Sequence, residues 1–269
     1  MNKCILFFDI DGTILTEDGT RIIPESTGDA LLEAKKNGHL LFVNTGRVFL
    51  NVEPMIRTLG FDGFVCGCGT HIIYQDKELF HHELDSSLYR KTVEITRKCK
   101  MDVLYEARDL NALDGCMEKN KALKELITYF TQDGRRMVSV DDSEFHFDKF
   151  TAWYPLEYTD MQKEFKEYAL EYFDYIDRGI QGDYGMCEIV PKGYSKGTGI
   201  QYLLEYFNLP HDRSYAFGDS TNDLPMLTFA AHSVAMGGSP EVVKDKVEYV
   251  TGTIDEDGLA EAMKYYGLI

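Results

Sequence analysis

The chain has 269 residues, of which 44% are hydrophobic and 27% charged, and it contains no apolar run long enough to span a bilayer. Its formal net charge is −17, from 45 acidic and 28 basic residues, so its field repels the phosphates of nucleic acids and anionic lipids. We therefore expect a globular protein, long enough for two domains, that binds neither nucleic acid nor membrane. A small anionic substrate remains compatible with this charge, because a bound cation can reverse the sign of the field locally.

The N-terminal segment MNKCILFF begins directly with a strand pattern and carries no small-residue cleavage signature, so we expect a cytoplasmic protein. Its cysteines are then expected to be reduced, buried thiols. The pair Cys66 and Cys68 lacks the two-residue spacer and the partner pair of a zinc site, so it predicts packing or the lining of a site. The six cysteines are Cys4, Cys66, Cys68, Cys99, Cys116 and Cys187.

The first element is an apolar run, Ile5 to Phe8, that ends abruptly in Asp9-Ile10-Asp11-Gly12-Thr13. Such a run is typical of a fully buried strand in a parallel sheet, and ligands of open α/β sheets bind beyond the carboxyl ends of such strands. Asp9 is therefore expected where a buried strand opens onto a site, with Asp11 on the turn beside it. Two carboxylates this close repel unless one is protonated or a cation lies between them. The alternative is an ordinary Asp-rich turn.

The same order of elements recurs along the chain: a short apolar strand, a small or polar residue at its end, then a helix. Strands alternating with helices predict an α/β fold, a Rossmann-like parallel sheet with helices on both faces. The further strands are expected at 40–43, 64–66, 215–217 and 233–236, and the helices at 24–37, 49–59, 198–207, 223–230, 240–245 and 258–266.

The middle of the chain differs, because it is richer in aromatic and charged residues and lacks the polar strand ends. A hairpin is expected at 72–80, followed by an inserted α+β module at 83–186. The predicted division is therefore a catalytic core at 1–82 and 187–269 with a cap domain at 83–186. Within the insert we expect helices at 87–100, 122–131 and 160–173, and strands at 102–105, 137–140, 147–154 and 186–190.

Three further polar segments fall at the predicted strand ends or helix starts. Thr45 and Gly46 offer a hydroxyl and free backbone N–H groups, and Lys196 begins a helix, where a cation and amides can face a phosphate. Asp219 begins a second acidic strand end, Gly218-Asp219-Ser220-Thr221-Asn222-Asp223. Taken singly, each has an ordinary explanation as a turn, a solvated lysine or a helix cap. Taken together, they predict one shared site.

The order Asp-Ile-Asp-Gly-Thr, Asn-Thr-Gly-Arg, Ser-Lys-Gly and Gly-Asp-Ser-Thr-Asn-Asp resembles the haloacid dehalogenase superfamily of phosphotransferases. The long insert after the third strand is similar in position and size to the large α/β cap of the Cof-type phosphatases, type IIB. These motifs cover roughly half of the chain. The resemblance implies a Mg²⁺-dependent phosphatase that acts on a small phosphorylated metabolite, a sugar phosphate or a phosphorylated cofactor, through an aspartyl-phosphate.

The resemblance also implies a role for each matching residue. Asp9 would attack phosphorus, and Asp11 would protonate the leaving alcohol and then deprotonate the attacking water. The phosphoryl oxygens would be held by Thr45, Gly46, Lys196 and Asn222, and Mg²⁺ by Asp9, the backbone carbonyl of Asp11 and Asp219, with Asp223 and Arg47 in support. Mg²⁺ prefers one or two carboxylates plus substrate phosphate and water, which agrees with this set.

Two features bear on the alternatives. The dehalogenase members lack a second aspartate at the position of Asp11, so its presence favours phosphoryl transfer. The family often carries Asn-Gly-Ala where this chain has Cys68-Gly69-Thr70, which leaves substrate contacts from that loop open. The alternatives are a phosphomutase or phosphotransferase, in which the phosphoryl group passes to another hydroxyl, and a non-catalytic regulator that binds a phosphorylated metabolite. The sequence predicts neither which phosphorylated metabolite is the substrate nor any protein partner.

Overall fold

A computed structural model describes residues 3–17, 19–115 and 120–269. The chain forms two compact units: unit 1 comprises Met1–Arg47, Val52–His81 and Tyr194–Ile269, and unit 2 comprises Val48–Asn51 and His82–Gly193. We expected the chain to return to the catalytic core at residue 187. That residue lies inside strand β11 (Tyr184–Pro191), which pairs within the sheet of unit 2. The chain therefore returns to unit 1 only after Gly193. The short segment Val48–Asn51 was not expected to group with the insert.

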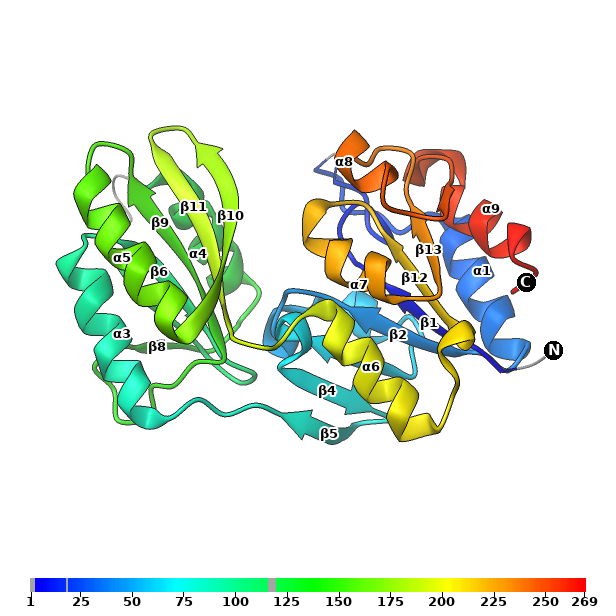
Figure 1. Cartoon of the computed structure of the whole chain (residues 1–269), viewed down its shortest axis with the longest axis horizontal. Coiled ribbons are helices and arrows are strands. Elements are labelled where there is room, and N and C mark those ends of the chain that lie inside the picture. The colour runs from blue at the N-terminus through cyan, green and yellow to red at the C-terminus, as the bar shows by residue number, and fades with distance from the viewer. Residues whose placement is uncertain (1–2, 18, 116–119) are drawn as a thin grey trace. The chain divides into compact units, whose positions relative to one another are not determined.

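Within the described residues, unit 1 contains an 8-stranded sheet in the order β14-β13-β12-β1-β2-β3-β4-β5 (Figure 1). The strands from β14 to β3 pair in parallel, and the hairpin β4–β5 adds an antiparallel edge. The bounds are β1 Ile5–Phe8, β2 Leu40–Asn44, β3 Gly63–Cys66, β4 His71–Tyr74, β5 Lys77–His81, β12 Ser214–Gly218, β13 His232–Ala235 and β14 Tyr249–Val250.

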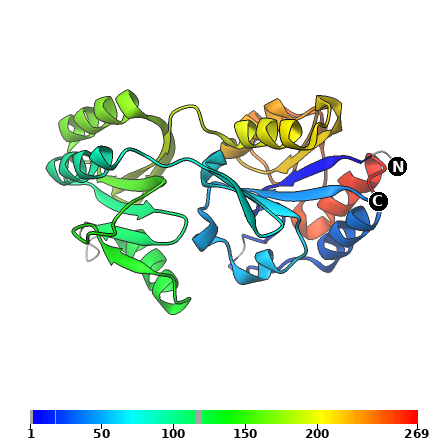
Figure 2. The ribbon, with the colours of Figure 1, turned by 90° about the horizontal axis from the view of Figure 1, so that it is seen from below.

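Helices cover both faces of this sheet, which is why β1 reads as a continuous apolar run with all four residues buried. Helices α6 and α7 pack on one face, and α1 and α9 lie on the other (Figure 2). The predicted α/β fold with a mainly parallel core sheet is confirmed. The bounds are α1 Glu25–Lys36, α2 Pro54–Arg57, α6 Lys196–Phe207, α7 Leu224–Phe229, α8 Glu241–Lys244 and α9 Gly258–Tyr265.

The register of the central strands brings the polar strand ends together. Phe8, the last residue of β1, pairs with Val43 of β2 on one side and Phe217 of β12 on the other. Because these strands run in parallel, the residues that follow them emerge at one edge of the sheet. Asp9, Thr45 and Asp219 therefore start from neighbouring positions.

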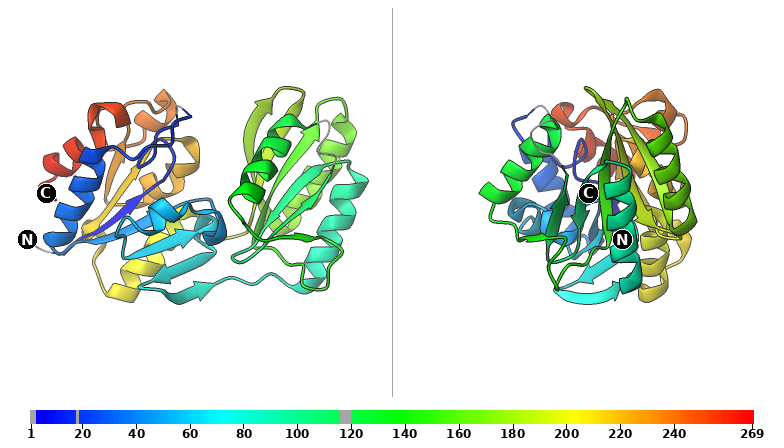
Figure 3. Two further views of the ribbon diagram at one scale, coloured as in Figure 1. Left: turned by 180° about the vertical axis from the view of Figure 1, so that it is seen from behind. Right: turned by 90° about the vertical axis from the view of Figure 1, so that its left-hand side faces the viewer.

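Unit 2 contains a 6-stranded sheet among its described residues, in the order β10-β11-β9-β6-β7-β8, antiparallel except for the pair β7–β8. Figure 1 shows α3 and α5 in front of this sheet, and the view from behind in Figure 3 shows α4 on its other face. The bounds are β6 Asp102–Glu106, β7 Asn111–Asp114, β8 Met137–Ser139, β9 Lys149–Pro155, β10 Phe173–Gln181, α3 Ser86–Lys98, α4 Lys121–Gln132 and α5 Thr159–Tyr172.

The predicted helix at 49–59 is wrong. The structure has a 3-10 turn, Phe49–Asn51, and a separate helix α2 that begins at Pro54. Proline is well suited to the first position of a helix, because its missing N–H would have no partner there, but it cannot continue a preceding one. The strands β7, β10 and β14 were not predicted.

Among residues 3–17, 19–115 and 120–269, none of the helices combines the length and the apolar composition that crossing a membrane requires. The cysteines that lie in these ranges form no disulfide with one another and are buried, as expected; they are Cys4, Cys66, Cys68, Cys99 and Cys187. Cys116 lies outside the described residues.

Candidate active site

Asp9 lies directly beyond the last residue of β1. Its backbone N–H donates to the carbonyl of Phe217 at 3.0 Å, which continues the β1–β12 ladder by one bond and fixes the start of the turn. The residue is 5% exposed, and its carboxylate oxygen Oδ1 lies 2.5 Å from Nζ of Lys196. A nearly buried carboxylate is thus held at the sheet edge by one cation.

Lys196 is the first residue of α6 and is 1% exposed. Ser195 and Thr198 form a capping box at this helix start, and Asn44, the last residue of β2, donates its side-chain N–H to the carbonyl of Lys196 at 2.9 Å. The ammonium group of Lys196 also lies 2.5 Å from Oδ1 of Asp223. Burial lowers the pKa of Lys196, but Asp223 and Asp9 outweigh it and hold the pKa above its ordinary value, so the side chain is a cation.

Asp219 and Asp223 come from the turn that follows β12. Asp223 is fully buried, and its second oxygen, Oδ2, accepts from the backbone N–H groups of Asp219 and Ser220, both at 3.0 Å. A Cβ on Gly218 would lie 2.7 Å from the Cβ of Asp223, so this close turn requires a glycine. One oxygen of Asp223 thus binds Lys196, and the other accepts from the amides of the turn.

Carboxylate oxygens of Asp9, Asp219 and Asp223 lie within 4.8 Å of one another. Burial raises the pKa of Asp9 to about 7, with Asp223 adding to the effect, and burial together with Asp9 raises that of Asp219 to about 8. Oδ1 of Asp219 is buried, and none of the residues that the structure describes forms a hydrogen bond with it. Lys196 contacts Asp9 and Asp223, and no ion pair to Asp219 is found among the described residues. The three carboxylates thus lack positive charge, and a cation with oxygen ligands would supply it.

Gly12 allows the Asp219 carboxylate to close against the turn that carries Asp11. Its φ is +72°, and a Cβ there would lie 2.5 Å from Oδ2 of Asp219. Any other residue would therefore be strained in the backbone and would collide with the carboxylate.

Asp11 belongs to a second charged network. Arg47 holds it in a two-oxygen fork, with Nη2 at 2.7 Å from Oδ1 and 2.6 Å from Oδ2, and Nη1 of Arg47 lies 2.7 Å from Oε1 of Glu53. Arg21 pairs with both Asp11 and Glu53. Burial lowers the pKa of Arg47, but Asp11 and Glu53 raise it above the ordinary value. The network fixes the Asp11 carboxylate at the rim of the acidic cluster.

The remaining predicted site residues lie on neighbouring turns. Thr45 is 2% exposed, its hydroxyl oxygen accepts from the N–H of Arg47 at 3.2 Å, and Gly46 between them is half-buried. Asn222 is half-buried, and the hydroxyl of Ser220 donates to its side-chain oxygen. The structure thus brings Asp9, Lys196, Asp219 and Asp223 into one cluster, while the role of each remains a prediction.

Sequence reasoning missed Arg21, Asn44 and Glu53. Asn44 stood inside the quoted Asn-Thr-Gly-Arg segment, so its place at a strand end was the available signal. Glu53 lay inside the helix wrongly expected at 49–59, and Arg21 lay in a polar loop, so neither carried a local signal.

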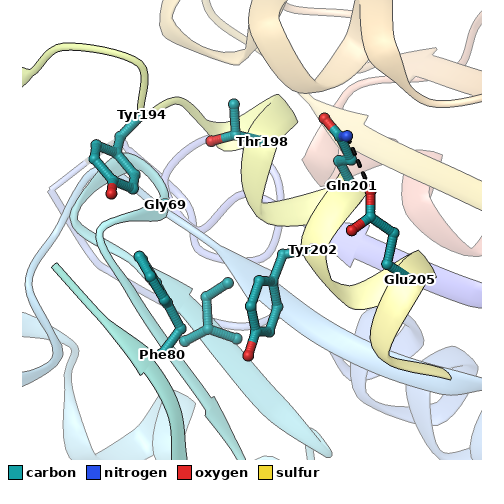
Figure 4. A pocket seen from close by; sticks show the side chains of 8 residues that line it. Gly69, Phe80, Tyr194, Thr198, Gln201, Tyr202 and Glu205 are labelled. Carbon is teal, nitrogen blue, oxygen red and sulfur yellow. Dashed lines mark hydrogen bonds between the residues drawn. The ribbon is translucent and has the colours of Figure 1, made fainter.

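A separate pocket of about 220 Å³ lies in unit 1 against α6, and none of the predicted site residues lines it (Figure 4). Its lining consists of Gly69, Ile72, Phe80, Tyr194, Thr198, Gln201, Tyr202 and Glu205. The rings of Phe80 and Tyr194, which lie near the end of the second segment of unit 1 and at the start of its third, stack with their centroids 5.8 Å apart.

The haloacid dehalogenase-like hydrolase family matches residues 6–263 of the chain. This chain belongs to the haloacid dehalogenase-like hydrolases. The predicted membership of the Cof-type subclass IIB is confirmed, as is the enzyme class, a phosphatase of this superfamily. The family also implies a divalent metal, which agrees with the acidic cluster.

Relatives match along the whole chain. YkrA of Bacillus subtilis strain 168 is 28% identical over 269 residues, covering 100% of both chains. The 5-amino-6-(5-phospho-D-ribitylamino)uracil phosphatase YitU of the same organism is 26% identical over 277 residues, covering 97% of each. The structure of the subclass IIB sugar phosphatase BT4131 superposes with a TM-score of 0.82 at 26% identity, covering 99% of this chain and 100% of that one.

Proposed function

We propose that this hydrolase is a Mg²⁺-dependent phosphatase that hydrolyses a phosphorylated polyhydroxy metabolite, a sugar phosphate or a phosphorylated cofactor, through an aspartyl-phosphate on Asp9. One observation carries the proposal. Asp9 lies at a strand end with Oδ1 at 2.5 Å from Nζ of the buried Lys196, in a cluster where Oδ1 of Asp219 is buried and has no hydrogen-bond partner among the described residues. A carboxylate beside fixed positive charge is suited to accept a phosphoryl group.

In the first step, an oxygen of Asp9 attacks phosphorus and the bond from phosphorus to the leaving oxygen breaks. The leaving oxygen takes a proton from Asp11, which ends the step as a carboxylate. Lys196 balances the charge of Asp9 before attack and faces the transferring group afterwards, without needing to reorganise, because its ammonium is buried and held on two sides.

In the second step, a water attacks phosphorus, Asp11 takes a proton from that water, and the bond between phosphorus and Asp9 breaks. Inorganic phosphate leaves, and both aspartates return to their starting states. In the structure both oxygens of Asp11 accept hydrogen bonds from Arg47. The fork must therefore open on one side for each proton transfer, and an anionic substrate that attracts Arg47 would open it.

The residues present fit a divalent cation. Asp9, the backbone carbonyl of Asp11 and Asp219 would hold it, since both oxygens of Asp223 already bind Lys196 and the turn amides. When bound, Mg²⁺ would reduce the repulsion between the attacking carboxylate and the negatively charged phosphoryl oxygens. Thr45, Gly46 and Asn222 would contact the phosphoryl group.

The proposed substrate class follows two relatives. One is a phosphatase whose named substrate carries a phospho-D-ribityl chain, and the other is a sugar phosphatase. Both act on a phosphate attached to a polyhydroxy chain or ring.

Phosphate release from a panel of sugar phosphates, phosphorylated polyols and nucleotides, with Mg²⁺ and with EDTA, tests the proposal. We expect release in Mg²⁺, with the polyhydroxy compounds ranked above the nucleotides, and none in EDTA. Release that persists in EDTA would contradict the metal. No release from the panel or from p-nitrophenyl phosphate would overturn the phosphatase and favour a binding regulator. Transfer to an added alcohol in place of release would indicate a phosphotransferase.

A further inference from the structure

The segment between Arg47 and Val52 belongs to unit 2, although both of its neighbours in the chain belong to unit 1. The chain thus passes from unit 1 to unit 2 and back within a few residues, immediately after the Thr45–Arg47 turn of the candidate site. We call residues 47–53 the tether loop. Its two ends, Arg47 and Glu53, are joined by an ion pair of 2.7 Å in unit 1.

The tip of the tether loop is fixed by Asn51, which is 2% exposed. Its side-chain N–H groups donate to Oε1 of Glu106 and Oδ1 of Asn111, both at 3.0 Å, and its side-chain oxygen accepts from Asn111 at 3.1 Å. Arg135 also donates to the side-chain oxygen, at 3.3 Å, and to the backbone carbonyl, at 3.2 Å. An amide has two donors and two acceptor sites, and Asn51 uses all of them inside unit 2.

This anchor rests on rigid parts of unit 2. Glu106 and Asn111 face each other across the β6–β7 pair, and the guanidinium of Arg135 lies 4.3 Å from the ring centroid of Phe130. Breaking a buried polar network leaves its members unpaired, so the network resists deformation. Asn51 therefore follows any displacement of unit 2.

The chain from Asn51 to Glu53 has little slack. Two residues span at most about 7 Å, so a displacement of the anchor by a few Å must move Glu53 or break the Asn51 bonds. Glu53 is buried and its side chain bonds to Arg47, which holds both oxygens of Asp11. A displacement of unit 2 can therefore move Asp11, the carboxylate proposed as general acid and base, through Glu53 and Arg47.

We propose that Asn51 is a positioning residue that couples unit 2 to the Arg47–Asp11 fork, so that Asp11 is correctly placed only while the tether loop is anchored. This inference rests on the proposed function for the role of Asp11. It assigns Asn51 no contact with substrate.

Two variants test the coupling. Asn51→Ala removes the anchor at the tip, and Arg135→Lys weakens it from within unit 2 while keeping the charge, in case the first variant does not fold. The matched control is Thr96→Val on α3, which removes another fully buried hydrogen bond of unit 2, the 2.8 Å bond to Tyr105, without touching the tether loop.

Hydrogen exchange gives a readout that does not depend on activity. The amides of Gly67 and Cys68 donate to the carbonyls of Arg47 and Thr45, at 2.8 and 3.1 Å. We expect both anchor variants to speed exchange at Gly67 and Cys68 by about tenfold or more, and the control to leave these amides unchanged. Exchange that rises only within 82–193 would overturn the coupling.

Kinetics give the functional readout. We expect the anchor variants to lower kcat/KM for an alkyl phosphate about tenfold more than for p-nitrophenyl phosphate, whose leaving group needs little protonation. The control should leave this ratio at the wild-type value. Equal losses on both substrates would overturn the positioning role. If the wild type hydrolyses neither substrate, the proposed function has failed, and the exchange experiment still decides the coupling.

Discussion

Replacing Lys196 with methionine removes the ammonium group that contacts both Asp9 and Asp223, while nearly keeping the volume of the side chain. Lys196 is 1% exposed, and its loss leaves the buried carboxylates of Asp9 and Asp223 without the ammonium group that both contact. Removing one partner of a buried ion pair costs roughly 3–5 kcal/mol. At about 2–4 °C per kcal/mol for a unit of this size, that predicts a drop in melting temperature of about 6–20 °C.

The loss of stability caused by replacing Lys196 should depend on pH. Burial, with Asp223, raises the pKa of Asp9 to about 7 even with Lys196 present. A group whose pKa is higher in the folded than in the unfolded state stabilises the fold at low pH, and that contribution is lost as the pH rises through the folded-state pKa. Losing Lys196 raises the pKa further, so the drop in melting temperature should be larger at about pH 8.5 than at about pH 5.5.

Differential scanning calorimetry in EDTA at the two pH values measures both effects. Lys36→Met on α1 is the matched control, because this lysine is exposed and should change the melting temperature by about 1 °C or less. An equal drop at both pH values, or no drop, would refute the view that Lys196 holds ionised carboxylates together.

Three further outcomes are expected. Mg²⁺ should raise the melting temperature more at about pH 8.5 than at about pH 5.5, because the pKa of Asp9 lies at about 7 and that of Asp219 at about 8, raised by burial in both cases; an equal rise would contradict a site built on these carboxylates. Asp11→Asn should lower the rate roughly 10²–10⁴-fold on an alkyl phosphate and less on p-nitrophenyl phosphate, and equal losses would remove it as the general acid. Burial raises the pKa of Glu188, but its two cationic partners lower it more, to about 2, so its contribution to stability is present above the ordinary value of 4.5 and is lost as the pH falls toward 2. Glu188→Gln should therefore destabilise unit 2 by roughly 3–5 kcal/mol at neutral pH, followed in urea by the fluorescence of Trp153, with a difference from wild type that shrinks on acidification; a constant difference would contradict the ionised pair.

The core elements were predictable because their signals are local. A strand buried on both faces must be apolar throughout, as β1 is, and in a parallel sheet the polar residue after it must lie at the shared edge. These two facts together predict that Asp9, Thr45 and Asp219 lie near one another.

The missed elements have physical reasons. Strand β10 lies at the edge of its sheet, carries Asp177 and Gly179, and has a register shift between Asp177 and Ile180, so its pattern is not that of a regular strand. The two residues of β14 give no periodicity to detect.

The tether loop could not be predicted because its cause is distant in sequence. Asn51 pairs with residues 55 and 60 positions away, and a polar residue inside an otherwise helical pattern gives no indication of such partners. The Arg47–Asp11 fork is similar: both residues were singled out, but their contact depends on side-chain placement across 36 positions.

The most direct test of the account is to identify the phosphorylated residue during turnover. Wild-type enzyme, mixed with Mg²⁺ and a substrate it hydrolyses, is quenched in acid and digested, and the peptide that contains Asp9 is analysed by mass spectrometry, with Asp9→Asn in parallel. We expect one phosphoryl group on Asp9 in the wild type, and neither this adduct nor phosphate release in the variant. Phosphate release at a near-normal rate from Asp9→Asn would contradict it.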